Sequence, residues 1–102
     1  MTSALEAPDA VRLVGDGSVW LLDVREGWEW NAGHAGSAHH IPMGELQARQ
    51  DELPSKGTIA VICHTGQRSR LVTDALLGAG YTTVNVDGGM DAWKLAGGDV
   101  AA

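Results

Sequence analysis

Two short, almost continuous apolar segments constrain the fold most strongly. They are residues 19–22 (VWLL) and residues 58–62 (TIAVI). A strand with one face in water alternates apolar and polar residues, whereas these segments are typical of strands covered on both faces of a parallel sheet. Two weaker segments, residues 83–86 and 38–41, are candidates for further strands, and Pro42 ends the second of them.

Helical patterns lie between the predicted strands. We expect helices at residues 8–15, 26–30, 43–53, 69–77 and 90–95. The fourth of these has the most regular apolar side, which consists of Leu71, Val72, Ala75, Leu76 and Ala79. Because strands and helices alternate along the chain, the sequence predicts an α/β fold with a mainly parallel sheet.

Size and charge exclude several classes of function. The 102 residues fit one domain, 1–102, with a single core, and 13 acidic against 7 basic residues give a net charge of −6. Without surplus positive charge, the chain is neither a general nucleic-acid binder nor a polybasic membrane-surface protein. Residues 1–10 do not resemble a signal peptide and no segment could span a membrane, so we expect a cytoplasmic location.

Residues 95–102 are rich in Gly and Ala, and we expect this tail, 98–102 above all, to fray.

The chain contains one cysteine, Cys63, which excludes an intrachain disulfide and a zinc site built on several thiolates. Cys63 follows the strongest predicted strand, and parallel sheets bind ligands beyond the carboxyl ends of their strands. Gly66 allows a tight turn, and Ser69 can cap the helix that follows. We therefore expect backbone N–H groups to converge on the sulfur, which would lower the pKa of the thiol and favour the nucleophilic thiolate.

The charge near Cys63 supports this interpretation. Between Leu53 and Thr73 the chain has no Asp or Glu but contains Lys56, Arg68 and Arg70. The alternative is that Cys63 is a small core residue, as many lone cysteines are. A core cysteine, however, does not need Gly, Arg and Ser arranged behind it.

The sequence is compatible with two roles for several other polar residues near the predicted strand ends. Arg68 near a helix start requires a compensating anion, and we expect it to bind the donor or to support the loop. His64 either tunes the site or simply faces solvent. Asp23 and Arg25 should lie on the same edge as Cys63, where we favour an ion pair that anchors the loop over a part in catalysis.

The remaining histidines and the tryptophans give no sign of a ligand site. His34, His39 and His40 lack the spacing of a metal site, and we expect His34 to be a buried, hydrogen-bonded residue. The four tryptophans are expected to pack in the core and at its rim. Trp93 should hold the last helix near the site.

Four segments together resemble single-domain rhodaneses, which are sulfurtransferases: residues 22–26 (LDVRE), 33–42 (GHAGSAHHIP), 63–69 (CHTGQRS) and 88–93 (GGMDAW). The resemblance covers about residues 19–97. It implies a three-layer fold with helices on both faces of the sheet. It also implies a persulfide on Cys63, no metal or cofactor, and an active-site loop formed by Cys63, His64, Thr65, Gly66, Gln67 and Arg68, with Ser69 next.

The implied activity moves a sulfane sulfur from thiosulfate or a small persulfide to cyanide or a thiol. A thioredoxin-like or biosynthetic protein could also be the acceptor. One alternative is a phosphatase or arsenate reductase of similar architecture, but those have five residues between cysteine and arginine, whereas four separate Cys63 from Arg68. A second alternative is a noncatalytic sulfur carrier or binding module.

Overall fold

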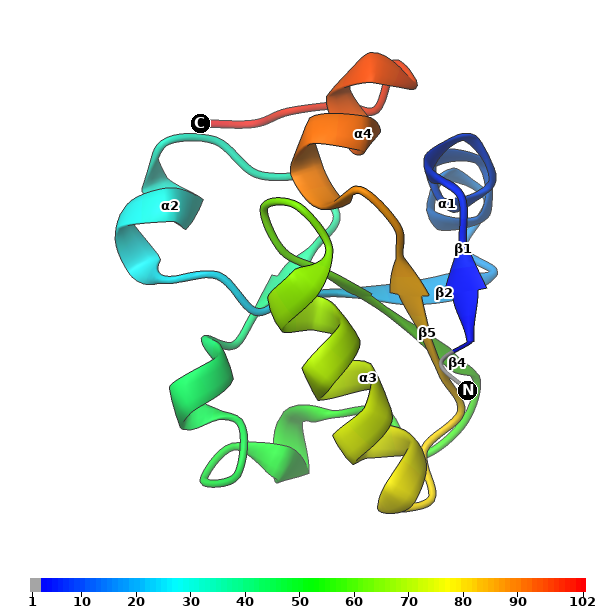
Figure 1. The fold of residues 1–102 in the computed structure, drawn as a ribbon, viewed down its shortest axis with the longest axis vertical. Helices are drawn as coiled ribbons and strands as arrows, with labels where there is room; N and C mark the ends of the chain where they lie inside the picture. The colour runs from blue at the N-terminus through cyan, green and yellow to red at the C-terminus, as the bar shows by residue number, and fades with distance from the viewer. Residues whose placement is uncertain (1–2) are drawn as a thin grey trace.

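The computed structural model describes residues 3–102 and confirms the α/β fold (Figure 1). The elements in chain order are β1 (Ala4–Leu5), α1 (Ala7–Gly15), β2 (Val19–Asp23), α2 (Gly27–Asn31), β3 (His39–His40), the 3₁₀ helices η1 (Met43–Glu45) and η2 (Gln50–Glu52), β4 (Thr58–Ile62), α3 (Gln67–Gly78), β5 (Thr83–Val86) and α4 (Gly89–Leu95). All strand pairs are parallel, and the order across the sheet is β1-β5-β4-β2-β3.

The sheet is covered on both faces because its strand residues alternate between two apolar clusters. Leu22 and Val61 belong to one cluster, with residues of α3 and of the segment that carries η1 and η2. Leu21 and Ala60 belong to the other, with residues of α1 and α4. In Figure 1, α3 lies on one side of the strands, and α1 and α4 lie together on the other. The continuous apolar segments therefore mark buried strands, as predicted.

The connections between strands reverse direction at the centre of the sheet, between β2 and β4. The chain runs from β2 outward to β3 on one side and from β4 outward to β5 on the other. Asp23, the last residue of β2, is in register with Ile62, the last residue of β4. Such a switch point is where open parallel sheets bind ligands, and Cys63 follows β4 directly at this position.

The predicted helix at residues 43–53 is wrong. This segment forms η1, a turn and η2, and only Leu46 and Leu53 in it are buried. A continuous helix needs an apolar stripe of three or four residues in every two turns, which the segment lacks. Arg49 instead links its two ends through ion pairs with Glu45 and Glu52, at 3.0 and 2.7 Å.

The C-terminal tail is anchored, so the predicted fraying is also wrong. Ala101 forms an antiparallel bridge with His34, and the Asp99 carboxylate accepts a hydrogen bond from the Gly36 N–H at 2.8 Å. The indole N–H of buried Trp93 donates to the Asp99 carbonyl at 2.8 Å. A Cβ at Gly98 would collide with the Trp93 ring. Gly98 therefore allows the tail to pack closely against Trp93, although the Gly- and Ala-rich composition of the tail suggests disorder.

Two further features complete the fold. No sequence pattern predicts β1, whose two residues pair with Asn85 and Val86 of β5 at the edge of the sheet. Among residues 3–102, no helix combines the length and apolar character needed to cross a membrane.

Candidate active site

The loop after β4 and the first turn of α3 place three hydrogen-bonding groups around the buried Cys63 sulfur. The Gly66 N–H lies 3.2 Å from Sγ, the Ser69 N–H 3.3 Å, and the Ser69 hydroxyl 3.3 Å. Gly66 turns the chain with φ of 101°, in the left-handed region that glycine adopts without strain. Thr65 and Gln67 have exposed side chains. The loop thus forms a cradle whose donors point at one sulfur atom.

These donors shift the thiol toward its ionised form. Burial raises the pKa of Cys63, because a buried thiolate loses hydration. The Ser69 hydroxyl and the N–H groups of Ser69, Gly66 and Thr65 favour the thiolate, and together they outweigh burial, so the pKa of Cys63 is lowered. A buried cysteine in an apolar site alone would have a raised pKa.

Ser69 has a different role from the predicted one. The helix α3 begins at Gln67, two residues earlier than expected, with Gly66 as its N-cap residue and no side-chain cap. Ser69 is therefore inside the first turn, fully buried, with its hydroxyl on the sulfur. The sequence predicts Ser69 at the helix start because serine is common at N-cap positions, but the turn at Gly66 sets the actual start.

The compensating anion of Arg68 is Glu29 of α2. The guanidinium donates to both carboxylate oxygens of Glu29, at 2.7 and 2.8 Å. The Glu29 carboxylate also accepts the Glu26 N–H at 3.0 Å, in a capping box at the start of α2. The Arg68 hydrogen bonds lower the pKa of Glu29 to about 2 against the opposing effect of burial. The loop therefore has no acidic neighbours in the sequence but does have one in the fold. The Arg68–Glu29 pair connects the loop to α2.

The start of α4 holds the first two residues of the loop. The Met90 N–H donates to the Cys63 carbonyl at 2.8 Å, and the Asp91 N–H donates to the His64 carbonyl at 3.2 Å. A Cβ at Gly89 would collide with both carbonyl oxygens. Gly89 is thus a site residue that the sequence analysis does not include. The Gly88-Gly89 pair before the last predicted helix is the sequence signal that indicates such a close approach.

Two side chains complete the surroundings of the loop. His64 is exposed, and its Nε2 lies 3.1 Å from an Asp91 carboxylate oxygen on α4. The buried Asn85 of β5 donates to the Gly66 carbonyl at 3.3 Å and to Asp87 at 3.0 Å. The sequence does not predict a role for Asn85 at the site, because a single Asn in an apolar strand does not form a recognisable pattern.

Asp23 and Arg25 form a buried ion pair on the edge where Cys63 lies, at 2.8 Å. Arg25 also donates to the carbonyl of Gly33 at 2.9 Å and to that of Glu29 at 3.4 Å. The pair joins the end of β2 to α2 and to Gly33, which follows α2. Neither residue makes a hydrogen bond to Cys63 among those in the described chain, which agrees with an anchoring part.

The three histidines of residues 34–40 pack against tryptophans. Trp30 stacks on His34 and His40, with ring centroids 3.6 and 4.7 Å apart, and His39 stacks on Trp20. His34 is half-buried, and its Nδ1 lies 3.0 Å from the Trp30 carbonyl. Within residues 3–102, no three His, Cys, Asp or Glu side chains gather as metal ligands would.

Comparison with known proteins agrees with this architecture. Residues 6–96 match the family model of the rhodanese-like domain. The chain is 37% identical over 83 residues to "Putative sulfurtransferase YtwF" of Bacillus subtilis, covering 81% of each protein. It is 39% identical over 79 residues to "Putative sulfur carrier protein YrkF" of the same organism, covering 76% of this chain but only 43% of YrkF.

A solved structure shows the same fold along almost the whole chain. The crystal structure of a rhodanese-related protein from Thermoplasma volcanium superposes with a TM-score of 0.90 at 30% identity, covering 97% of both chains. The match of the family model to residues 6–96 and this superposition lead to one conclusion: the chain belongs to the rhodanese-like domain family.

Proposed function

We propose that the protein is a sulfurtransferase that carries a sulfane sulfur as a persulfide on Cys63. The observation that carries the proposal is the cradle of three donors, from Gly66 and Ser69, around one buried sulfur. Donors fixed before the reaction stabilise a thiolate without reorganisation, as they would stabilise the anion of a persulfide. The name of YtwF, a relative at 37% identity, supports the same class of activity.

The transfer consists of two displacements at sulfur. With thiosulfate as donor, the Cys63 thiolate attacks the outer sulfur, a new S–S bond forms, and sulfite leaves with the electron pair of the broken S–S bond. An acceptor such as cyanide or a thiolate then attacks the terminal sulfur, and Cys63 leaves as a thiolate. Charge balances in both steps and no net oxidation occurs. Because the chain has one cysteine, the acceptor is a separate molecule.

Arg68 supports the loop in this scheme. Its guanidinium is already held by two hydrogen bonds to Glu29, which gives it an anionic partner without any substrate. A phosphatase of similar architecture has a loop one residue longer, which makes room for a tetrahedral oxyanion. The six-residue loop and the engaged Arg68 therefore favour sulfur transfer over phosphate hydrolysis.

Steady-state kinetics test the proposal. We expect thiocyanate to form from thiosulfate or a small persulfide plus cyanide, with parallel double-reciprocal lines because the donor product leaves before the acceptor binds. Cys63→Ser should abolish turnover. A sulfur carrier would load once without turning over, and hydrolysis of an aryl phosphate at a comparable rate would favour the phosphatase. Either result would contradict the proposal.

A further inference from the structure

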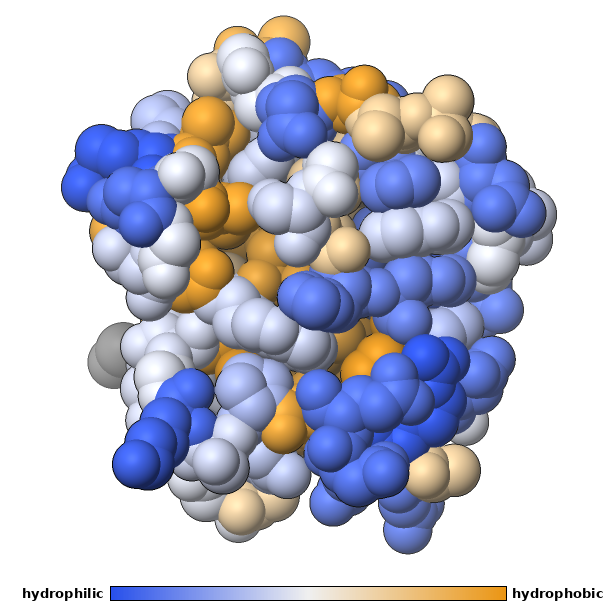
Figure 2. All heavy atoms as spheres, turned by 180° about the vertical axis from the view of Figure 1, so that it is seen from behind, coloured by the Kyte–Doolittle hydropathy of each residue, from blue (hydrophilic) through white to orange (hydrophobic). Residues whose placement is uncertain are grey.

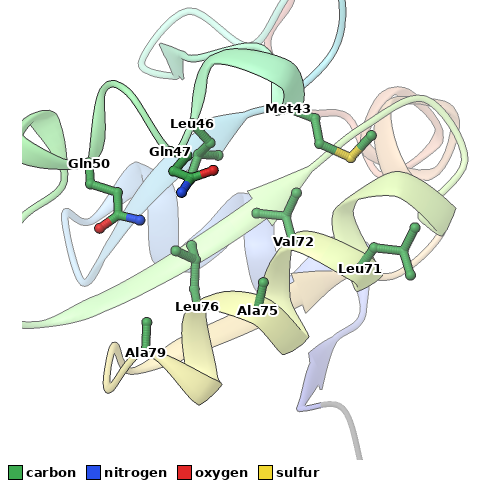
Figure 3. Close-up of a pocket in the computed structure, with 9 residues that line it drawn as sticks. All are labelled: Met43, Leu46, Gln47, Gln50, Leu71, Val72, Ala75, Leu76 and Ala79. Carbon is green, nitrogen blue, oxygen red and sulfur yellow. The ribbon is translucent and has the colours of Figure 1, made fainter.

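An apolar groove of about 410 Å³ lies between α3 and the segment that carries η1 and η2. Figure 3 shows Met43 and Leu71 at one end of it and Gln50 and Ala79 at the other, with the side chains of the two walls facing each other. From Leu71 to Ala79 the α3 wall is about 12 Å long, at 1.5 Å per residue. The volume is in the range of small-molecule sites, about 300–1,000 Å³.

The lining of the groove is uncharged. Seven of its nine residues are apolar, and the other two, Gln47 and Gln50, carry neutral amides. The same segment carries charge elsewhere, where Arg49 pairs with Glu45 and Glu52. From behind, Figure 2 shows hydrophilic side chains gathered over this segment at the lower right. The groove therefore favours an uncharged ligand, because an ionic group inside it would lose hydration without gaining a partner.

The walls of the groove pack on the same core as Cys63. Its residues Leu46, Val72 and Leu76 belong to the same buried cluster as Cys63. Leu71 and Val72 follow Ser69, which touches the sulfur, by less than one helical turn. Leu71 and Met43, at one end of the groove, are 65% and 40% exposed. The residues that border the sulfur and those that line the groove are therefore neighbours on α3.

We propose that this groove binds the uncharged, largely apolar arm of a small thiol that accepts sulfur from Cys63. The inference rests on the proposed function and specifies its acceptor. The thiolate of the acceptor attacks the terminal sulfur of the Cys63 persulfide, a new S–S bond forms on the acceptor, and Cys63 leaves as a thiolate. The two Gln side chains can hydrogen-bond an amide in the arm, while the apolar wall of α3 contacts its methylene groups.

A series of N-acyl cysteamines tests this inference. We expect kcat/KM for transfer to the acetyl, butyryl and hexanoyl compounds to rise by about twofold for each added methylene, half the effect of complete burial. From acetyl to hexanoyl, the increase is about 16-fold. Cyanide, which has no arm, serves as the reference acceptor. A kcat/KM that does not change with acyl length, beside normal transfer to cyanide, would overturn the inference and leave the proposed function in place.

Two matched variants locate the effect. Ala75 lines the groove on exposed helix surface, so Ala75→Leu fills the groove with a residue that favours helix. Ala48 is also exposed, lies in the facing segment and is not part of the lining. We expect Ala75→Leu to flatten the dependence on acyl length while transfer to cyanide is unchanged, and Ala48→Leu to leave both unchanged. Equal slopes in the two variants would contradict the groove as the binding site.

Binding without chemistry separates this inference from the proposed function. The probe is S-methyl N-hexanoyl cysteamine, which cannot accept sulfur, added to the Cys63→Ser protein. We expect saturable shifts of the Met43 methyl resonance in NMR spectra, and no such shifts in a protein that also carries Ala75→Leu. Absence of saturable binding would overturn the inference. Saturable binding in a protein whose wild type fails to transfer sulfur to cyanide would support the groove and contradict the proposed function.

Discussion

The link between Glu29 and Arg68 gives a prediction with a calculable pH dependence. Glu29→Gln removes the negative charge under Arg68 but keeps an oxygen that can accept the Glu26 N–H of the capping box. The substitution therefore tests the charge pair and leaves the start of α2 capped. It also removes the fixed connection between the Cys63 loop and α2, which the two hydrogen bonds of 2.7 and 2.8 Å provide.

The expected size follows from the pKa of Glu29, which the folded chain lowers from 4.5 to about 2. At 1.36 kcal/mol per pKa unit this corresponds to roughly 3 kcal/mol. Arg68 is 32% exposed, so water screens part of the interaction, and we expect the pair to contribute about 1–3 kcal/mol. Because the folded pKa is below the unfolded one, this contribution is complete above about pH 5 and is lost as the pH falls through 4.5 toward 2.

Urea unfolding of wild type and Glu29→Gln from pH 7 to pH 2 measures this contribution. We expect a difference in unfolding free energy of about 2 kcal/mol at pH 7 that shrinks toward zero at pH 2. Glu45→Gln is the control, since Glu45 forms an exposed pair with Arg49 and is expected to change stability by less than about 0.5 kcal/mol. A Glu29→Gln effect that is independent of pH, or no larger than that of Glu45→Gln, would refute the reasoning.

Three further predictions concern the site. Ser69→Ala removes the hydroxyl on the sulfur, so the pKa of Cys63 should rise, measured as the pH dependence of alkylation; an unchanged midpoint would contradict the cradle. Gly89→Ala should destabilise the fold by more than Gly57→Ala and slow thiol alkylation, because both positions have positive φ but only position 89 also forces a collision with the loop; equal effects would show that backbone strain alone matters. Asp23→Asn should lower unfolding free energy by about 3–5 kcal/mol in urea, since it leaves a buried guanidinium unpaired, and a loss below about 1 kcal/mol would disprove an anchoring part.

The sequence predicts the centre of this fold well, and its periphery poorly. The strands β2 and β4 are buried on both faces, so nearly every residue in them is apolar and the pattern is strong. The short β1 depends on its pairing with β5, and the segment of the two 3₁₀ helices depends on the packing of Leu46 and Leu53 in the core cluster that includes strand residues. The same holds for the tail, whose partners at His34 and Gly36 are more than 60 residues away in the sequence.

The site shows the same division. The backbone donors around Cys63 come from one short stretch of chain, the loop and the first turn of α3, so glycine and helix-start preferences are enough to predict their convergence. Glu29 is 39 residues from Arg68, and only the need of a cation for a partner indicated that such an anion exists. The apolar side of α3 was predicted too, but not that Val72 is covered while Leu71 remains 65% exposed. How neighbouring segments cover a helix depends on their packing, which no local pattern specifies.

The central claim is that Cys63 carries sulfur covalently, and intact mass spectrometry tests it most directly. After incubation with thiosulfate or a small persulfide and removal of the donor, we expect the protein to gain about 32 mass units, the mass of one sulfur, and to lose them on addition of cyanide. Cys63→Ser should gain nothing. A wild-type protein that never gains this mass, or a Cys63→Ser variant that gains it equally, would contradict the account.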